Sequence, residues 1–325
     1  DEENPDVAML NQVELFDIKT SVLDFVDRIA NLKIMLRKHF RGYPELISFS
    51  SKYFYSDNLQ AVKIRGKTVD EVIQFKEIEH DGLLELKGNT NQQEADLIVQ
   101  YLQDLVNKKD YKDVCVITPH SEQQRLIWQT VRATNEFVEI DENLKLRVFT
   151  FDTCQGEEAH TIIYSMVATL ERDRLNHIFA KDIKESVDVE ESLRLQRLNV
   201  GFSRAKECII IYHSKPLPEF KGGIQVALNH FKGVLEKGRL LPDQSQVDQS
   251  SPMEKKVLSW LNQISIKGEL GEKMEIDAQF EVGAYLKQLD ETYKHPKYKV
   301  DFLVKVKGKQ NSIQIIIEYD GFKEH

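Results

Sequence analysis

The sequence predicts an α/β protein in which a larger domain built on a parallel sheet is followed by a smaller domain. An amphipathic helical pattern at 91–106 precedes the continuously apolar run 114–118, and another helical pattern occupies 119–133. Such alternation of helix and strand is typical of a parallel α/β sheet. A polar stretch at 241–252 then separates two patterned segments. The 325 residues, 41% of them hydrophobic, are sufficient for two cores.

Composition narrows the class of protein. The net charge of −9 does not suggest a nucleic-acid binder, although basic residues can still cluster on one surface. Cys115, Cys154 and Cys208 lie in or beside apolar strands and form no CxxC pair, so we expect buried, reduced thiols. There is no signal-peptide pattern and no apolar run of the roughly eighteen residues that a membrane span needs, so we expect a cytoplasmic protein without a membrane partner.

The first ninety residues begin with an acidic, weakly patterned stretch at 1–20. Residues 21–36 have the apolar spacing of an amphipathic helix. Residues 36–59 predict a loop and a helix whose packing face is rich in aromatic side chains, and 60–90 predicts short strands and turns. RGKT at 65–68 lacks the upstream glycine that a phosphate-binding loop requires.

The centre of the larger domain is RVFTFDTCQGEEAHTIIYSMV, residues 147–167. Two strand-forming runs, 148–151 and 162–164, flank a polar loop. In that loop Gly156 permits unusual backbone angles or the close approach of a ligand. A loop held between two buried strands is a rigid support for chemistry, but an ordinary polar hairpin is an alternative.

The segment LQRLNVGFSRAKECIIIY, residues 195–212, predicts a helix to residue 206 followed by a short strand. Arg197 and Arg204 are seven positions apart, two helical turns, so both side chains are expected on one helix face. Such a pair could simply be solvated, or it could stabilise the charge that develops on a transferred phosphoryl group. The acidic stretch 182–191 before it predicts an exposed insertion.

FDTCQGEE followed by RLNVGFSRAK resembles motifs V and VI of superfamily-one helicases, whose usual forms are TVDSFQGxE and RRLNVALTRAK. The similar branch contains the nonsense-mediated-decay helicase and the Dna-type helicase-nucleases. Residues 36–59 resemble a third segment of that branch, with HFRG in place of QYRM. The resemblance implies a second RecA-like domain, over 1–240, in which Arg41 contacts the γ-phosphate of ATP. The residues that it assigns to ATP are Arg41, Gln155, Gly156, Glu157, Arg197 and Arg204, with Arg204 also catalytic.

Other expectations follow from the same resemblance. NxxEA followed by VITPHSEQ implies that Gln123 lies near nucleic acid or the nucleotide, unless this segment is plain scaffold. No phosphate loop, Walker B acid pair or G-D-x-x-Q segment occurs, so we expect the first motor domain to be a partner missing at the N-terminus. We expect the chain alone not to hydrolyse ATP.

The smaller domain begins after the linker with a helix that carries Glu254 in its first turn. YKVDFLVKV and SIQIIIEYD then predict a hairpin in which Asp301 faces Glu318, with side chains roughly 5 Å apart, and Asp320 projects from the same face. Facing carboxylates repel each other unless a divalent cation lies between them. In the alternative register, shifted by one residue, the side chain of one of the two acids would point into solvent.

Residues 253–325 resemble the very-short-patch-repair-like branch of the PD-(D/E)XK nucleases, in a strand ending D-F and in E-x-D-G…H. The resemblance implies a smaller α/β restriction-endonuclease-like domain, which we expect to continue beyond residue 325. It implies that Mg²⁺ is held by Asp301, Glu318 and Asp320, with Glu254 and His325 as supporting catalytic groups. Asp320 replaces the lysine of E-x-K, as is common in that branch. Residues 285–309 carry seven lysines and three acids with interleaved tyrosines, which indicates either a DNA surface or an edge strand protected by lysines.

Three functions are consistent with these patterns. The first is an ATP-dependent helicase-nuclease that translocates on single-stranded or duplex DNA and cleaves it with Mg²⁺, in defence or DNA repair. The second is a remodelling helicase whose nuclease-like domain is a non-catalytic DNA clamp. The third is an RNA helicase, since these motifs do not separate RNA from DNA.

Overall fold

The chain divides into two compact units, Asp1–Arg37 and Lys38–His325. This computed structural model describes residues 22–63, 67–79, 88–184, 188–267, 274–307 and 312–319. The described part of the first unit contains one helix, α2 (Val22–Ile29), so the helix predicted to residue 36 ends early. Leu32 and Leu36 are 77% and 85% exposed. A helix is stable chiefly when its apolar face is packed, and these side chains have no such packing.

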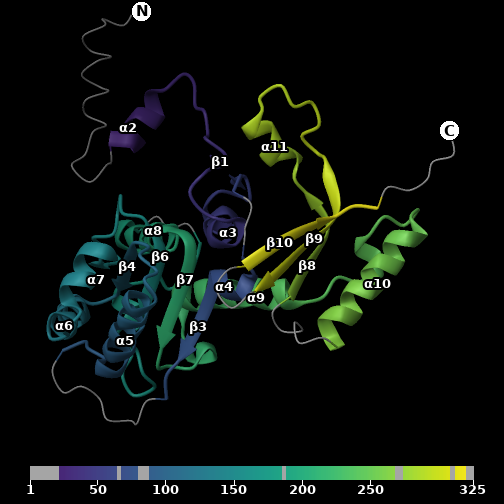
Figure 1. Cartoon of the computed structure of the whole chain (residues 1–325). Helices are drawn as coiled ribbons and strands as arrows, with labels where there is room; N and C mark the ends of the chain where they lie inside the picture. The colour runs from purple at the N-terminus through teal and green to yellow at the C-terminus, as the bar shows by residue number, and fades with distance from the viewer. Residues whose placement is uncertain are drawn as a thin grey trace, which may run out of the picture. The chain divides into compact units, whose positions relative to one another are not determined.

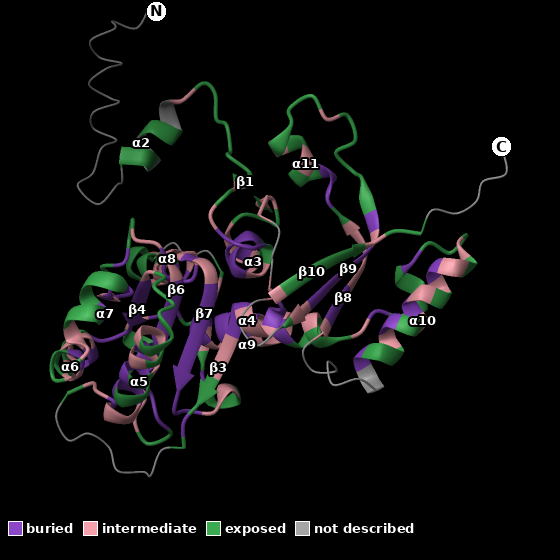
Figure 2. Ribbon diagram, in the orientation of Figure 1, coloured by how far each residue is buried: buried purple, intermediate pink, exposed green. Residues whose placement is uncertain are grey.

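A five-stranded parallel sheet forms the larger domain of the second unit, in the order β3-β7-β6-β4-β5 (Figure 1). The strands are β3 (Ile73–Glu77), β4 (Val114–Thr118), β5 (Arg147–Thr150), β6 (Ala159–Ser165) and β7 (Ala205–His213). Every residue of β4 is buried, as in a strand covered on both faces. In Figure 2 the strands β4, β6 and β7 are correspondingly buried. The predicted RecA-like α/β sheet is confirmed.

Helices cover both faces of this sheet (Figure 1). Val116 and Ile163 belong to a core shared with one set of helices, whereas Ile117 and Ile162 belong to a core shared with the other. This division follows from the alternation of side chains along each strand. The first set is α5 (Gln92–Lys108), α6 (Ser121–Arg132) and α7 (Phe137–Asn143). The second set is α3 (Pro44–Phe54), α4 (Val69–Val72), α8 (Val189–Gly201) and α9 (Gly222–Arg239).

Shorter elements complete the larger domain. Strands β1 (Lys38–His39) and β2 (Gln60–Ala61) pair in parallel next to α3. Single turns of 3-10 helix lie at Leu175–His177, Leu217–Glu219 and Gln244–Gln246. The three cysteines are buried and free, as predicted. Among the described residues, no helix combines the length and the apolarity that a membrane crossing requires.

The runs on either side of the QGEE loop are strands, but they do not form a hairpin. Strands β5 and β6 each pair in parallel with β4, which lies between them. The connecting segment 151–158 therefore runs from the carboxyl end of β5 to the amino end of β6. Phe151 anchors it in the core at 2% exposure. A Cβ on Gly201 would lie 2.3 Å from the Phe151 ring, so this contact requires glycine.

The smaller domain is an antiparallel sheet in the order β10-β9-β8 with two helices. Its elements are α10 (Pro252–Lys267), β8 (Met274–Glu281), α11 (Gly283–Leu289), β9 (Lys299–Lys307) and β10 (Ser312–Ile317). A small core joins α10 to the sheet through residues such as Leu258, Ile276 and Phe302. Strand β8 ends at Glu281, and the helix α11 begins two positions later at Gly283. The boundary predicted at 241–252 stays a prediction, because Lys38–His325 is one compact unit.

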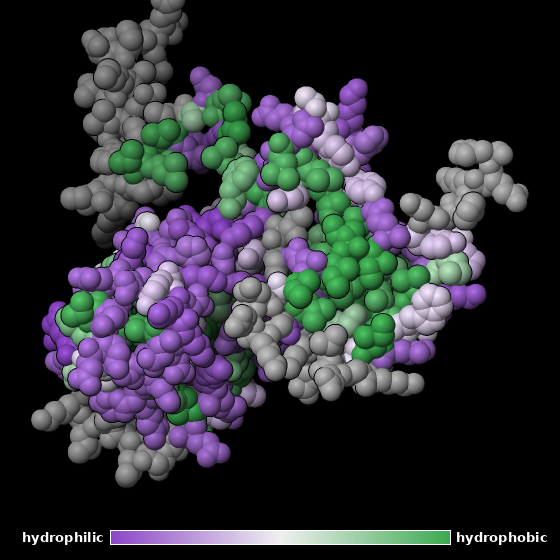
Figure 3. Space-filling view, viewed as in Figure 1, coloured by the Kyte–Doolittle hydropathy of each residue, from purple (hydrophilic) through white to green (hydrophobic). Residues whose placement is uncertain are grey.

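The hairpin of β9 and β10 has the predicted register. Lys307 pairs with Ser312 and Phe302 pairs with Ile317, so the next pair in sequence is Asp301 with Glu318. The alternative register is excluded. As the edge strand, β10 exposes apolar side chains, with Ile313 at 58% and Ile316 at 57% exposure. Figure 3 shows hydrophobic atoms gathered over β9 and β10.

Candidate functional site

Arg41 and Arg204 come together beside the amino end of β7. Arg41 follows β1; its Nη1 donates to the Ser203 carbonyl at 3.2 Å, and its Nε lies 2.5 Å from Glu158 Oε2. Arg204 directly precedes β7, and its Nε donates to the Val200 carbonyl at 2.6 Å. Burial, and next the positive charge of Arg41, lowers the pKa of Arg204. Two cations that disfavour each other's charge provide a place for an anion.

An open pocket of about 560 Å³ lies at this cluster. Its lining residues are Lys38, His39, Phe40, Arg41, Glu158 and Lys206. Glu158 is the only acid among them, and it pairs with both Arg41 and Lys206. The hydrogen bond from Lys206 and the charge of Arg41 hold the pKa of Glu158 below its usual value. Phe40 is 65% exposed, so its ring face is available for stacking.

The segment that carries Arg41 lies directly against β7. A Cβ on Gly42 would lie 2.7 Å from the Ala205 carbonyl oxygen, so a side chain here would push the segment away. The amide of Gly42 donates to His39 Nε2 at 3.3 Å. Burial, followed by the charges of Arg41 and Arg204, lowers the pKa of His39. Thus the glycine of HFRG, which departs from the QYRM pattern, is needed for the close contact with β7.

The QGEE loop lies on the other side of Arg204. Gly156 has φ +85, and a Cβ there would meet nothing within 4 Å, so its conformation rather than space calls for glycine. Gln155 is exposed. The carbonyl of Glu157 accepts from Arg204 Nη1 at 3.5 Å, but its carboxylate is 2.6 Å from Arg147 Nη1 and belongs to that ion pair.

The acid that lines this pocket is Glu158. The carboxylate of Glu157, which the resemblance assigns to ATP, pairs with Arg147, and that assignment stays a prediction. Glu158 could have been identified from the sequence, because the QGxE pattern itself puts a glutamate two positions after Gly156. Lys206, His39 and Phe40 were also missed. Their side chains reach the pocket only because β1 and β7 bring their segments together.

Arg197 and Arg204 do not share a helix face. The helix predicted to residue 206 ends at Gly201, and Arg204 lies in the turn before β7. Arg197 instead forms an ion pair with Asp152 and donates to the Ile178 carbonyl at 3.0 Å. Gly201, the last residue of the helix, packs against the Phe151 ring, and β7 begins at Ala205.

Gln123 is part of the scaffold. It is fully buried, donates to the Asn91 carbonyl at 3.0 Å and to Ser165 Oγ at 3.1 Å, and accepts from the Asn91 amide at 2.7 Å. Beside it Glu94 is also fully buried and accepts from Ser165 Oγ at 2.6 Å and from the Val167 amide at 2.9 Å. Burial raises the pKa of Glu94 to about 7, although these hydrogen bonds oppose the change. The network joins α5 to the carboxyl end of β6.

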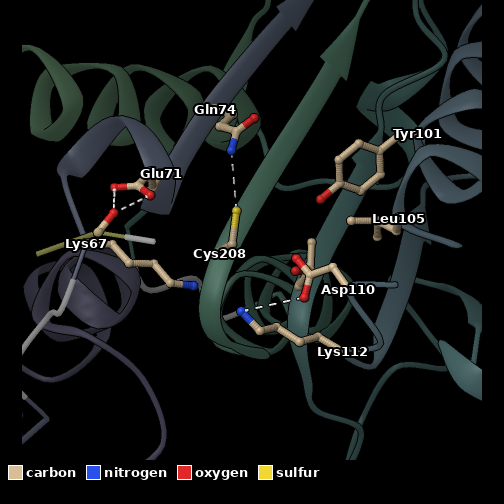
Figure 4. Close-up of a pocket in the computed structure, with 10 residues that line it drawn as sticks. Lys67, Glu71, Gln74, Tyr101, Leu105, Asp110, Lys112 and Cys208 are labelled. Carbon is tan, nitrogen blue, oxygen red and sulfur yellow. Dashed lines mark hydrogen bonds and ion pairs between the residues drawn. The ribbon is translucent and has the colours of Figure 1, made fainter. Parts of the chain in front are cut away.

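Another pocket, of about 580 Å³, lies beside β3, β7 and α5 (Figure 4). Its lining carries two lysines, Lys67 and Lys112, and two acids, Glu71 and Asp110. Gln74 Nε2 lies 3.9 Å from Cys208 Sγ within it. Lys67 forms an ion pair with Glu207 at 2.7 Å rather than standing in a phosphate-binding loop. Because its charges balance, this pocket attracts an anion less than the open pocket beside Arg41 and Arg204, which we call the arginine pocket.

In the smaller domain, Asp301 and Glu318 lie at the open end of the hairpin. Asp301 Oδ2 accepts from the Tyr319 amide at 2.7 Å, and Glu318 Oε1 accepts from the Tyr298 hydroxyl at 2.7 Å. The bond to Glu318 raises the pKa of Tyr298 to about 12. Carboxylate oxygens are ligands that Mg²⁺ prefers. The predicted Asp320 and His325 lie outside the described residues.

Glu254 is 6% exposed and accepts from the Asp248 amide at 3.1 Å and from Gln279 Nε2 at 2.9 Å. Gln279 has φ 51 and falls where the pairing of β8 with β9 skips a residue. Within the part of the chain that the structure describes, no three His, Cys, Asp or Glu side chains are grouped to hold a metal ion. The predicted Mg²⁺ ligands stay a prediction.

The basic stretch 285–309 contains a buried lysine. Lys305 is 1% exposed and pairs with Glu275 at 3.4 Å and with Asp277, so it does not contribute to a DNA surface. The sequence alone could not distinguish Lys305 from the other lysines of this stretch, because its acidic partners lie on β8.

Comparison with known proteins gives three likenesses. A family model described as AAA domain matches residues 18–215. An uncharacterized ATP-dependent helicase of Mycoplasma genitalium is 26% identical over 214 residues, which are 62% of this chain but 18% of that protein. This chain thus spans less than a fifth of that relative. The C-terminal domain of a possible DNA helicase from a Lactobacillus covers 57% of this chain and 96% of its own, at 10% identity and a TM-score of 0.29. A TM-score this low supports no conclusion about fold or function.

Proposed function

Because this chain belongs to the AAA domain family, we propose that it is a motor domain of an ATP-dependent helicase. Its arginine pocket would bind the phosphates of ATP. The observation that carries the proposal is an open pocket lined by Arg41 and by a single acid, with Arg204 close enough to Arg41 for the two charges to interact. Motifs V and VI, and the relative described as an ATP-dependent helicase, support the same function.

The chemistry follows from the charges of the pocket. Phosphoryl transfer spreads negative charge over the phosphate oxygens, and guanidinium groups stabilise it in the transition state. Arg41 pairs with Glu158, which orients its guanidinium, and the remaining N–H groups of that guanidinium would bind an incoming phosphate. Lys206 would add a point charge beside it. The exposed ring of Phe40 offers a surface on which a base could stack.

The test is ATP hydrolysis by the full-length protein with and without a nucleic-acid strand. Arg204→Ala should lower kcat about 1000-fold, the size of effect that arginines have in phosphoryl transfer. Arg125→Ala is the matched control, because Arg125 is exposed on α6 away from the pocket. Hydrolysis that is equal in wild type and Arg204→Ala would contradict the proposal. Comparison of DNA with RNA strands would separate the DNA helicase from the RNA helicase.

As a second activity we propose cleavage of DNA by the smaller domain. The register of the hairpin supports it, because Asp301 and Glu318 form the pair that follows Phe302 and Ile317. Asp301, Glu318 and Asp320 would hold Mg²⁺, which when bound supplies an activated water and neutralises the leaving oxygen. Lys294, Lys297 and Lys299 would contact the DNA backbone. Glu254 would support β8 through its bond with Gln279.

The assay is Mg²⁺-dependent cleavage of single-stranded and duplex DNA by the full-length protein and by an Asp301→Ala, Glu318→Ala double variant. Loss of cleavage in the double variant alone would support the nuclease. If both proteins leave DNA intact while ATP hydrolysis and DNA binding persist, the smaller domain is a DNA clamp.

A further inference from the structure

Arg147 lies outside the arginine pocket but is bonded to the loop that forms one side of it. Its Nη1 is 2.6 Å from Glu157 Oε2, and its Nη2 donates to the Glu158 carbonyl at 2.8 Å. The same Nη2 is 3.2 Å from Asp113 Oδ2. One guanidinium therefore joins a side chain and a backbone group of the QGEE loop to the carboxylate of Asp113, which lies outside the loop.

The Asp113 carboxylate is held by the sheet. Asp113 immediately precedes β4, and its Oδ1 accepts from the His160 amide at 3.1 Å and also pairs with the His160 ring. The carbonyl of Asp113 accepts from the Thr161 amide at 3.2 Å. Arg147 begins β5 and His160 lies in β6. Three adjacent strands thus hold the partners of Arg147 in fixed positions.

The opposite side of the loop contacts the two arginines of the pocket. The Glu158 carboxylate pairs with Arg41, and the Glu157 carbonyl accepts from Arg204. The loop contains Gly156, and glycine has more accessible backbone conformations than any other residue. Without a bond to the sheet, the loop could shift and move both contacts together.

We infer that Arg147 is a positioning residue that fixes the QGEE loop, so that Glu158 and the Glu157 carbonyl hold Arg41 and Arg204 in their catalytic geometry. This inference rests on the proposed ATP hydrolysis. Arg147 bonds to Glu157, to the Glu158 carbonyl and to Asp113, so it acts on the reaction through the loop. Small displacements of positioned groups lower the rate of the chemical step more than they lower substrate binding.

The experiment compares ATP hydrolysis by the full-length wild type, Arg147→Gln and Arg147→Lys, with Arg125→Gln as the exposed control. We expect Arg147→Gln to lower kcat about 10- to 100-fold with a KM for ATP close to wild type. Arg147→Lys keeps the charge and should recover part of kcat. In a double-mutant cycle, adding Glu157→Gln to Arg147→Gln should lower kcat little further, because the two groups act through one contact.

The outcomes are distinct. If wild type does not hydrolyse ATP, the proposed function fails and the inference fails with it. If wild type hydrolyses ATP and Arg147→Gln has the same kcat, the inference is wrong while the function stands. If Arg147→Gln does not fold, Arg147→Lys and Glu157→Gln carry the test, and an unchanged kcat in both overturns the inference. Additive effects in the cycle also overturn it.

Discussion

Glu94 provides a sharp prediction about stability, because it is a fully buried carboxyl group that accepts hydrogen bonds from the neutral donors Ser165 Oγ, Val167 N and Ser214 Oγ. Burial raises its pKa from 4.5 to about 7. The folded state therefore holds the Glu94 proton more tightly than the unfolded state does. The resulting stabilisation is fully present below about pH 4.5 and is lost as the pH rises through about 7.

The difference in pKa corresponds to about 3 kcal/mol, at about 1.4 kcal/mol for each tenfold change in the proton equilibrium. Glu94→Gln removes the titration and keeps the shape. Its amide nitrogen would face the donors Ser214 Oγ and Asn91 Nδ2, which costs stability equally at every pH. The informative quantity is therefore the change with pH, not the absolute loss.

The assay is urea unfolding of wild type, Glu94→Gln and the exposed control Glu139→Gln at about pH 5 and about pH 8. Between these two pH values, the free energy of unfolding of the wild type should fall by about 2 to 3 kcal/mol more than that of Glu94→Gln. The control should follow the wild type. Parallel pH profiles of wild type and Glu94→Gln would refute the reasoning, and would mean that Glu94 is hydrated or paired in the folded protein.

Two further predictions concern close packing and buried charge. Gly42→Ala should lower the free energy of unfolding by about 1 to 3 kcal/mol and slow ATP hydrolysis, because its Cβ would lie 2.7 Å from a carbonyl oxygen. Gly233→Ala, on α9 with nothing within 4 Å of the new Cβ, should instead stabilise by about 0.4 to 1 kcal/mol. In thermal unfolding the midpoint should therefore fall for Gly42→Ala and rise for Gly233→Ala. Midpoints that shift in the same direction would contradict the argument. Lys305→Met should lower the free energy of unfolding by about 3 kcal/mol, because it removes the buried ammonium group that pairs with Glu275 and Asp277. An unchanged midpoint of urea unfolding would refute this.

Local patterns predicted the elements whose residues repeat with a clear period. The helix α5, the buried strand β4 and the helix α6 are where the apolar spacing put them. The hairpin register also followed from local geometry, since the length of the turn sets the pairing of β9 with β10. Each of these depends on residues close together in the sequence.

The remaining features depend on residues far apart in the chain. Arg147 meets Asp113 across 34 positions only because β4 and β5 are neighbours. Arg41 reaches Ser203 across 162 positions. Gly201, at the end of α8, packs against the ring of Phe151. The resemblance to helicase motifs pointed to Arg41 and Arg204. The groups that each of these side chains contacts could be identified only from the three-dimensional structure.

The isoleucines of β10 have a practical consequence for handling the protein. This edge strand has no Lys, Arg, Asp or Glu from Ser312 to Ile317, and several of its isoleucines are exposed. A neutral, apolar edge readily pairs with strands of other molecules, and a single inward or edge charge commonly prevents this. Concentrated solutions of this chain should therefore precipitate through β10, and Ile315→Lys should raise the concentration at which it stays dispersed without disturbing the small core.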